Sequence, residues 1–184
     1  GVPMPSGRAG LIAGLPVQMA LRGLQAVLPS RFSERSEGGR AILREATRVQ
    51  ARVTEACFFT QEALPMLWSG LHMLNLGEPA GPSADLACGY ALMAAVAGIV
   101  PVHAMAEAWS RRVIELVESV GKPYDVAFVL QRVSSYHLWM ARWDLAEDGF
   151  RRETEIAHRV GDQRLLSDGL TCLSGAIIDR KSVV

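Results

Sequence analysis

The stretch VHAMAEAWSRRVIELVESVG at residues 102–121 decides the fold, because a related stretch follows it 40 residues later. RWDLAEDGFRRETEIAHRVG at residues 142–161 repeats its Ala-Glu dipeptide, its paired arginines and its final Val-Gly without a gap. Gly81 lies another 40 residues before Gly121 and so takes the equivalent position in the preceding stretch. A fixed internal period is typical of repeat proteins, in which neighbouring units stack to bury a shared core. A plain helical bundle is the alternative, but bundles have no fixed period.

Each repeat is expected to contain two helices and to end at a glycine. The glycines that follow apolar-periodic runs are Gly81, Gly121 and Gly161. Glycine ends a helix cheaply because it adopts the left-handed conformation without steric cost. Prolines and first-turn carboxylates then mark the start of the next helix: Pro82, Asp85, Pro123 and Asp125. Breaks at Pro101 and at Ala141-Arg142 separate the two helices within a pair.

The apolar spacing predicts an all-α fold, a right-handed array of antiparallel helix pairs with about 40 residues per repeat. The predicted pairs cover residues 40–76, 84–120 and 124–160, followed by a truncated pair from residue 163. The helix at 40–59 is expected to turn these residues inward: Ile42, Leu43, Ala46, Val49, Val53 and Ala56. In the second helices, Ala106 and Ala146 predict close crossings, with Trp109 and Phe150 filling the gaps between pairs.

The predicted division of the chain has three parts. Residues 1–32 form an N-terminal helix, expected at 16–28, and a segment that leads through a polar linker at 30–39 into the array. The array covers residues 33–178. The last six residues, Asp179 to Val184, resemble the in-frame translation of a common sequencing-library adapter, and we expect them to be a non-native tail.

Composition excludes several classes of function. Lys plus Arg equals Asp plus Glu at 19 each, which gives no electrostatic signature for nucleic acid or an anionic membrane. The most apolar stretch, residues 10–28, contains Gln18, Arg22 and Gln25, so no membrane span is predicted. The three cysteines are widely spaced and are expected to be buried free thiols in a reducing compartment: Cys57, Cys88 and Cys172. A cytoplasmic location is therefore expected.

Several stretches resemble the tetratricopeptide-like region of large bacterial signalling proteins. The residues that carry this resemblance lie at 28–32, 58–64, 74–76, 80–83, 120–123 and 143–162. Proteins of this family carry an AAA or STAND-type ATPase, often with a class III adenylate or guanylate cyclase domain and sometimes a protein kinase. Their catalytic residues lie in other domains, so the resemblance implies a regulatory segment with no catalytic residue and no cofactor of its own.

No constellation in the chain predicts chemistry. A G-x-x-x-x-G-K-[ST] loop is absent, and Gly121-Lys122 is followed by Pro123. The histidines lack metal-ligand spacing: His72, His103, His137 and His158. Glu147-Asp148 and the pair Glu153 and Glu155 are expected to be a solvated face beside Arg151 and Arg152. No nucleophile, base and orienting group occur together in the pattern of a triad.

The sequence therefore predicts a non-catalytic interaction segment whose partner is a protein, a peptide or another domain of the same chain. The first helices of the pairs are expected to line a concave surface that presents Tyr90, Gln131, Ser135 and Trp139. The alternative for Trp139 is burial between repeats. The alternatives for the whole chain are the sensor arm of a STAND-type ATP-dependent transcription regulator and a stand-alone all-α enzyme. No nucleic acid, membrane or metal partner is expected.

Overall fold

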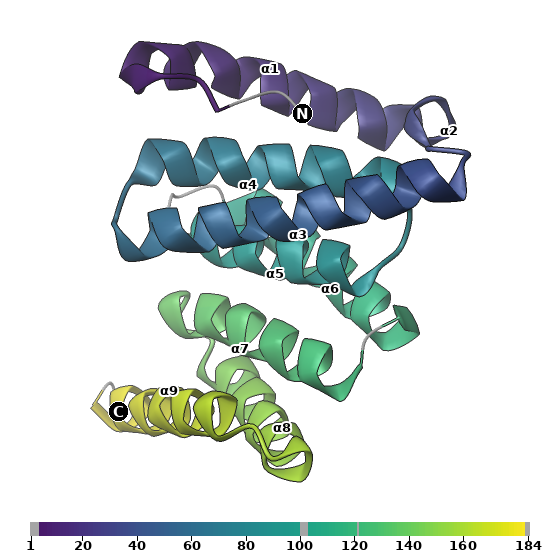
Figure 1. Ribbon diagram of the computed structural model, residues 1–184. Helices are drawn as coiled ribbons and strands as arrows, with labels where there is room; N and C mark the ends of the chain where they lie inside the picture. Colours follow the sequence, from purple (N-terminus) through teal and green to yellow (C-terminus); the bar gives the residue numbers. More distant parts are fainter. Residues whose placement is uncertain (1–3, 100–102, 121, 183–184) are drawn as a thin grey trace. The chain divides into compact units, whose positions relative to one another are not determined.

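A computed structural model describes residues 4–99, 103–120 and 122–182 (Figure 1). Over these residues the chain is all-α, with no strand, as the sequence predicted. The elements are α1 (Gly7–Val27), α2 (Pro29–Phe32), α3 (Glu37–Phe59), α4 (Ala63–Gly77), the 3-10 helix η1 (Glu78–Ala80), α5 (Ala84–Ile99), α6 (His103–Val120), α7 (Pro123–Trp139), α8 (Trp143–Val160) and α9 (Gln163–Ser182).

The predicted helix boundaries agree closely from α4 onward. The prediction of 143–160 matches α8 at both ends, and the other predicted ends lie within about three residues, except at the end of α9. Asp85 and Asp125 lie in the first turns of α5 and α7. The main-chain N–H of Lys122 donates to Asp125 Oδ2 at 3.0 Å, which satisfies a free donor at the start of α7. Gly121 and Pro101 lie outside the described residues.

The N-terminal helix was predicted too short. α1 begins at Gly7 and continues through Pro16, although a proline inside a helix costs about 3 kcal/mol. Packing against α4 offsets this cost. The side-chain amide of Asn75 donates to the main-chain oxygen of Gln18 at 2.9 Å, and Gln25 Nε2 donates to the main-chain oxygen of Asn75 at 2.9 Å.

The predicted linker at 30–39 is also largely helical. It contains most of α2, and α3 begins at Glu37, so that Gly38 and Gly39 lie in its first turn. The cause is the cap at Ser36, whose Oγ accepts a hydrogen bond from the main-chain N–H of Gly39 at 3.0 Å. Even two glycines therefore do not prevent the helix from starting here.

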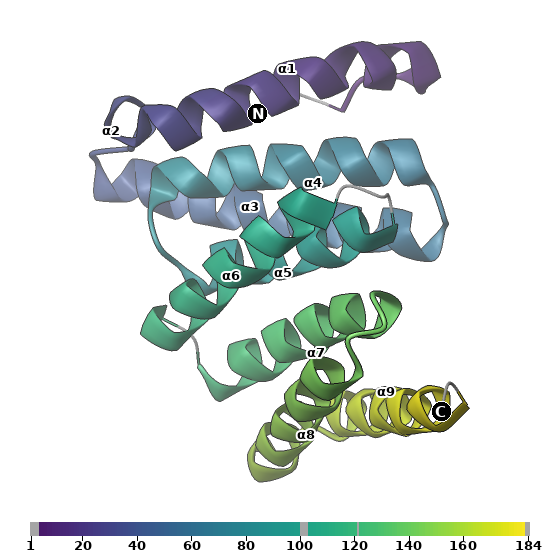
Figure 2. The same cartoon turned by 180° about the vertical axis from the view of Figure 1, so that it is seen from behind.

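The described chain divides into two compact units, residues 1–89 and 90–184, with the division inside α5. In the first unit, α3 and α4 lie side by side as an antiparallel pair, and α1 packs on α4 (Figures 1 and 2). The predicted N-terminal segment 1–32 is thus part of the same compact unit as the first helix pair. α4 forms the centre of this unit, with Trp68, Met73 and Leu74 fully enclosed.

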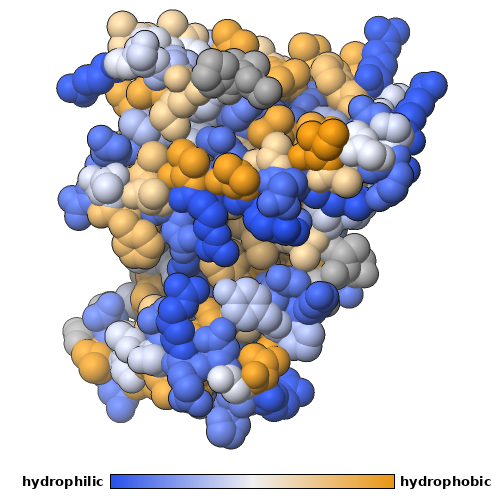
Figure 3. Space-filling view, viewed as in Figure 1, coloured by the Kyte–Doolittle hydropathy of each residue, from blue (hydrophilic) through white to orange (hydrophobic). Residues whose placement is uncertain are grey.

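The inward face of α3 was predicted wrongly at three positions. Ile42 is 71% exposed, and Val49 and Ala56 are also exposed, whereas Thr47 and Thr54 are buried. Figure 3 shows apolar side chains at the surface over α3. The residues predicted inward that are half-buried are Leu43, Ala46 and Val53.

Small side chains explain this rotation of α3. Thr54 Oγ1 lies 2.9 Å from Ser69 Oγ on α4, so one hydroxyl donates to the other, and the accepting hydroxyl donates to a main-chain oxygen of its own helix, Gln50 or Met66. Thr47 Oγ1 donates to the main-chain oxygen of Leu43 at 2.8 Å. Two threonines with satisfied hydroxyls let the helices approach closely, so packing overrides the apolar pattern of α3.

In the second unit, α7 and α8 form a pair, and α9 packs mainly on α8. Ala146, predicted at a close helix crossing, and Phe150, predicted to fill a gap between pairs, are both fully buried. Ala176 joins these two residues in one apolar cluster. A second cluster joins Ala127 of α7, Ala157 of α8 and Leu165 of α9.

Two turns, one in each unit, have the same hydrogen bonds. After α3, the N–H groups of Gln61 and Glu62 donate to the oxygens of Phe58 and Cys57. After α7, Ala141 and Arg142 donate to Leu138 and His137 in the same pattern, 80 residues later. Gln61 and Ala141 have positive φ, at 58° and 53°. The pattern is a Schellman motif, which satisfies the last carbonyls of a helix.

The predicted glycine stops agree with the backbone where the structure describes them. Gly161 ends α8 in the left-handed conformation, with φ 74° and ψ 19°. Gly81 also has positive φ, at 82°, and ends η1 rather than α4 itself. The chain therefore forms one turn of the tighter 3-10 helix between the end of α4 and Gly81.

The final helix extends beyond the predicted end at residue 178. α9 continues to Ser182 and so includes part of the segment predicted as a tail. Arg180 contributes to this extension, because its Nη1 lies 2.8 Å from Asp144 and 3.3 Å from Glu147 of α8.

Candidate functional site

The predicted binding face of α7 consists of Gln131, Ser135 and Trp139. Their spacing of four residues places all three on one side of the helix. The side chains become more accessible toward the end of α7: Gln131 is buried, Ser135 is half-buried and Trp139 is 44% exposed. Trp139 is thus partly exposed and partly buried, between the predicted presentation to a partner and the alternative of burial between repeats.

The other predicted contact residues are already engaged or enclosed. Ser135 Oγ donates to the main-chain oxygen of Gln131 at 2.8 Å, and Gln131 Oε1 accepts from Arg132 at 3.0 Å. Tyr90 lies on α5 and is only 2% exposed. Of the four predicted residues, the structure therefore presents chiefly Trp139 to solvent.

A polar cluster lies at the end of α7, close to Trp139 in the sequence. Arg142 in the following turn forms an ion pair with Glu107 of α6. The neighbouring Tyr136 hydroxyl and His137 Nδ1 are buried, with no hydrogen-bond partner among the described residues. Burial raises the pKa of Tyr136 and lowers the pKa of His137. Both groups are therefore neutral near pH 7, and the charges in this cluster are those of the Arg142–Glu107 ion pair.

A glycine on α5 lets the chain pack tightly against this region. A Cβ added to Gly98 would lie 2.7 Å from Tyr136 Cδ2 and 3.5 Å from Trp139 Cε3. The aromatic ring of Trp139 therefore rests against the backbone of α5 on one side. Such a ring is held in place before any partner binds, which reduces the entropy lost on binding.

A second polar group, Glu153 of α8, was predicted to be solvated and is instead enclosed. Its side chain has 0% exposure, and both carboxylate oxygens lack a hydrogen-bond partner among the described residues. Burial raises its pKa to about 8, and the nearby carboxylate of Asp168 adds to this rise, while Arg132 acts in the opposite direction. Glu155, by contrast, is exposed as predicted.

The sequence spacing of 40 residues contains a signal that could have predicted the burial of Glu153. Steps of 40 residues place Glu153 at the same register as Val113 and Met73, and all three side chains have 0% exposure. The prediction of a solvated face came from charge alternation along α8, which ignores this register. The residues 40 and 80 positions earlier therefore predict the burial of Glu153 better than the alternation of charge along α8 does.

The surroundings of Glu153 do not favour catalysis. The carboxyl group has no access to solvent and therefore to a substrate. Burial and the neighbouring carboxylates raise the pKa of the Cys172 thiol, which keeps it protonated and weakly nucleophilic. A general base or nucleophile must reach the atom on which it acts.

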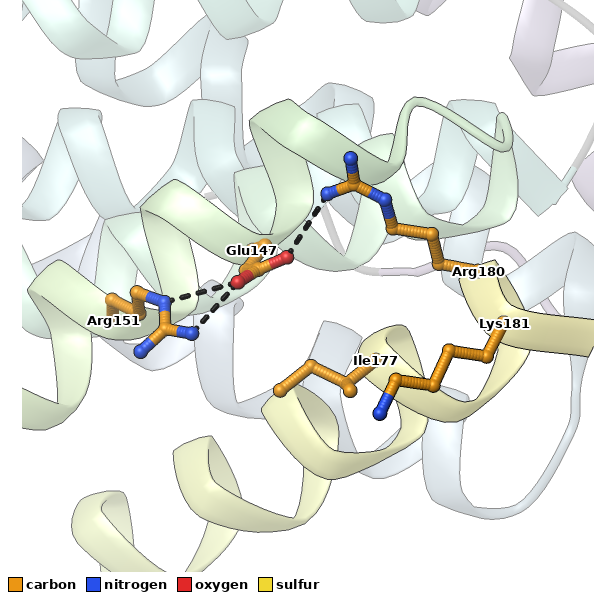
Figure 4. Close-up of a pocket in the computed structure, with 5 residues that line it drawn as sticks. All are labelled: Glu147, Arg151, Ile177, Arg180 and Lys181. Atoms are coloured by element: carbon orange, nitrogen blue, oxygen red, sulfur yellow. Dashed lines mark hydrogen bonds and ion pairs between the residues drawn. The ribbon is translucent and has the colours of Figure 1, made fainter. Parts of the chain in front are cut away.

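A surface pocket lies between α8 and the end of α9 (Figure 4). Its volume is about 530 Å³, and Glu147, Arg151, Ile177, Arg180 and Lys181 line it. Glu147 accepts hydrogen bonds from Arg151 at 2.7 Å and from Arg180 at 3.3 Å, so it neutralises part of the positive charge. Two of the five lining residues lie in the segment predicted as a tail, and we assign no function to this pocket.

The described residues contain no group of three or more side chains able to hold a metal ion. His72 is buried and stacks on Trp68 at 4.9 Å between ring centroids, and desolvation lowers its pKa. None of the three cysteines forms a disulfide; Cys57 is buried as predicted, whereas Cys88 and Cys172, also predicted to be buried, are only half-buried. No described helix combines the length and apolar character needed to cross a bilayer.

Comparison of the chain with protein-family models, curated proteins and solved structures finds no significant match.

Proposed function

We propose that the chain is a non-catalytic, right-handed array of antiparallel helix pairs with a period of 40 residues, which binds a protein or peptide partner. The observation that carries the repeat is the recurrence of burial along the second helices. The buried sets, each at steps of 40 residues, are Met66, Ala106 and Ala146; Ser69, Trp109 and Gly149; Gly70, Ser110 and Phe150; and Met73, Val113 and Glu153.

The turns and the first helices support the same period. The Schellman turns at Gln61 and Ala141 lie 80 residues apart, which is two steps of the period. On the first helices, Thr47, Ala87 and Ala127 are buried at steps of 40 residues, and so are Thr54, Ala94 and Ser134. Small residues at these positions suit close helix crossings, as stacked helix pairs require.

The binding role rests on Trp139. An exposed tryptophan held against a neighbouring backbone is a frequent anchor in protein interfaces, because it buries a large area with little loss of side-chain entropy. Ser135, one turn earlier on the same face, is half-buried, and its hydroxyl already donates to the main-chain oxygen of Gln131, so Trp139 carries the contact. An extended or helical peptide with an apolar anchor residue is the partner that this surface suits.

The resemblance to bacterial signalling proteins suggests the wider setting. In this proposal, partner binding by the array biases an ATPase or a nucleotide cyclase domain elsewhere in a longer protein. The sensor arm of an ATP-dependent transcription regulator is the second setting that fits the same array. Both settings rest on analogy with that family, whereas the binding experiment tests this chain alone.

Selection from a displayed peptide library tests the binding proposal. Peptides selected on the unmodified chain should lose at least about tenfold in affinity, or 1.4 kcal/mol, on Trp139→Ala. The matched control is Ile114→Ala, because Ile114 is an apolar residue with similar exposure, 42%, on α6. The proposal would be contradicted if selected peptides bound the unmodified chain, Trp139→Ala and Ile114→Ala equally, or if the library yielded no binder.

A turnover assay tests the non-catalytic part. The purified chain is expected to neither hydrolyse nor cyclise ATP or GTP above the rate of a buffer blank. Turnover that persists through purification and depends on a buried polar residue of this chain would favour an all-α enzyme instead.

A further inference from the structure

The carboxyl group of Glu153 lies between three helices of the second unit. Glu153 belongs to α8 and is fully buried, and the ionisable groups that act on it or on which it acts are Arg132 of α7 and Asp168 and Cys172 of α9. Neither of its oxygens has a hydrogen-bond partner among the described residues. A buried polar group without a partner is rare in folded proteins, because its desolvation is not compensated.

The backbone of α9 lies directly against this carboxyl group. A Cβ added to Gly169 would lie 2.8 Å from Glu153 Oε2 and 2.9 Å from Oε1. Only glycine lets α9 approach so closely, so the carboxyl group is covered by α9 itself. Its solvation therefore depends on whether α9 is in place.

The charge around Glu153 makes its ionised form costly while α9 is packed. Asp168 carries a like charge on the covering helix, and Cys172 provides a thiol with a raised pKa. Arg132 is the only cation among the groups that shift the pKa of Glu153. Asp168 is exposed and Arg132 is half-buried, whereas Glu153 is fully enclosed, so the lack of solvent around Glu153 and the like charge of Asp168 favour the neutral form of Glu153.

We propose that Glu153 acts as a proton-dependent latch, which holds α9 against α8 while the carboxyl group is neutral and releases α9 when the proton is lost. Release would expose the apolar residues that α9 covers, including Ala146 and Phe150 of α8. The latch would therefore couple pH to the availability of an apolar surface on the second unit.

The sign of the effect follows from proton linkage. A glutamate on the released helix has an ordinary pKa near 4.5, whereas burial in the closed state raises the pKa of Glu153 to about 8. Between these values the closed state holds one more proton than the open state. Each unit of rising pH therefore favours opening about tenfold, and the effect levels off above about pH 8.

Hydrogen exchange of the full chain measures this opening. After correction for the intrinsic pH dependence of exchange, the opening constant of peptides from residues 163–178 should rise about fiftyfold from pH 6 to pH 8. Peptides from α4, where Met73 takes the equivalent register, should show no such rise.

Two matched variants identify the carboxyl group responsible. Glu153→Gln keeps the shape of the side chain but cannot ionise, so opening of α9 should become independent of pH within about twofold. Glu155→Gln removes an exposed carboxylate two residues away and should leave the rise of about fiftyfold unchanged. Equal pH profiles for the wild type and Glu153→Gln would overturn the latch.

A direct titration decides the question even if Glu153→Gln fails to fold. The carboxyl carbon of Glu153 in the ¹³C-labelled wild-type chain should titrate near pH 8, together with the opening of α9. A carboxylate that is already ionised at pH 6 while α9 remains protected would overturn the proposal.

Discussion

The α3–α4 pair and the α7–α8 pair share a turn but differ in the chemistry they bury. Both turns are Schellman motifs with a non-glycine residue at positive φ. The first pair buries neutral hydroxyls that contact each other, Thr54 and Ser69, at 2.9 Å. The second pair buries the carboxyl group of Glu153 without a partner. The same backbone design can thus hold either a pH-independent or a pH-sensitive interior.

The difference arises at a single register position. Met73 of α4 and Glu153 of α8 are equally enclosed, but a thioether needs no hydrogen bond and a carboxyl group does. The first unit therefore has no reason to respond to pH at this place. The second unit combines a large apolar side chain, Phe150, with a titratable one in the same helix.

Truncation of Phe150 should have the largest effect on this comparison. Phe150→Ala is expected to lower the free energy of unfolding by about 3–5 kcal/mol, because it removes a fully buried ring and leaves a cavity. Denaturant unfolding followed by circular dichroism measures the change.

The matched control for Phe150→Ala is Phe59→Ala, since Phe59 is 73% exposed at the end of α3. That change should stay within about 0.5 kcal/mol. Similar losses for both variants would mean that the burial described for α8 is wrong.

The hydroxyl pair of the first unit should have an intermediate effect. Thr54→Val is expected to cost about 1–2 kcal/mol, because it removes the buried partner of Ser69 without changing the volume much. A double-mutant cycle with Ser69→Ala should give the same coupling energy at pH 6 and at pH 8. A coupling that changes with pH would break the contrast with Glu153.

The smallest effects are expected in the shared turns. Gln61→Gly and Ala141→Gly should each raise the free energy of unfolding by about 0.5–1 kcal/mol, because glycine adopts positive φ without strain. Gly161→Ala should lower it by about 1 kcal/mol. Thermal unfolding detects all three changes. A gain at one turn and a loss at the other would show that the two turns are not equivalent.

Part of this structure follows from sequence pattern alone. The ends of α8 are predictable because Ala141-Arg142 breaks the apolar run before it and Gly161 stops the run after it. The free state of Cys57 is predictable because no second cysteine lies nearby in the pattern. Trp139 was predicted on a candidate face, and its spacing from Ser135 is a property of any helix.

The sequence by itself determined that the described chain is helical and where most of its helices begin and end. Backbone geometry and local propensity act over a few residues, so neighbouring residues in the chain are enough to predict these features. Tertiary structure alone decided which face of α3 is buried, that α1 continues through Pro16, and that Glu153 is enclosed. These outcomes depend on contacts between residues far apart in the chain, where close packing outweighs the local preference.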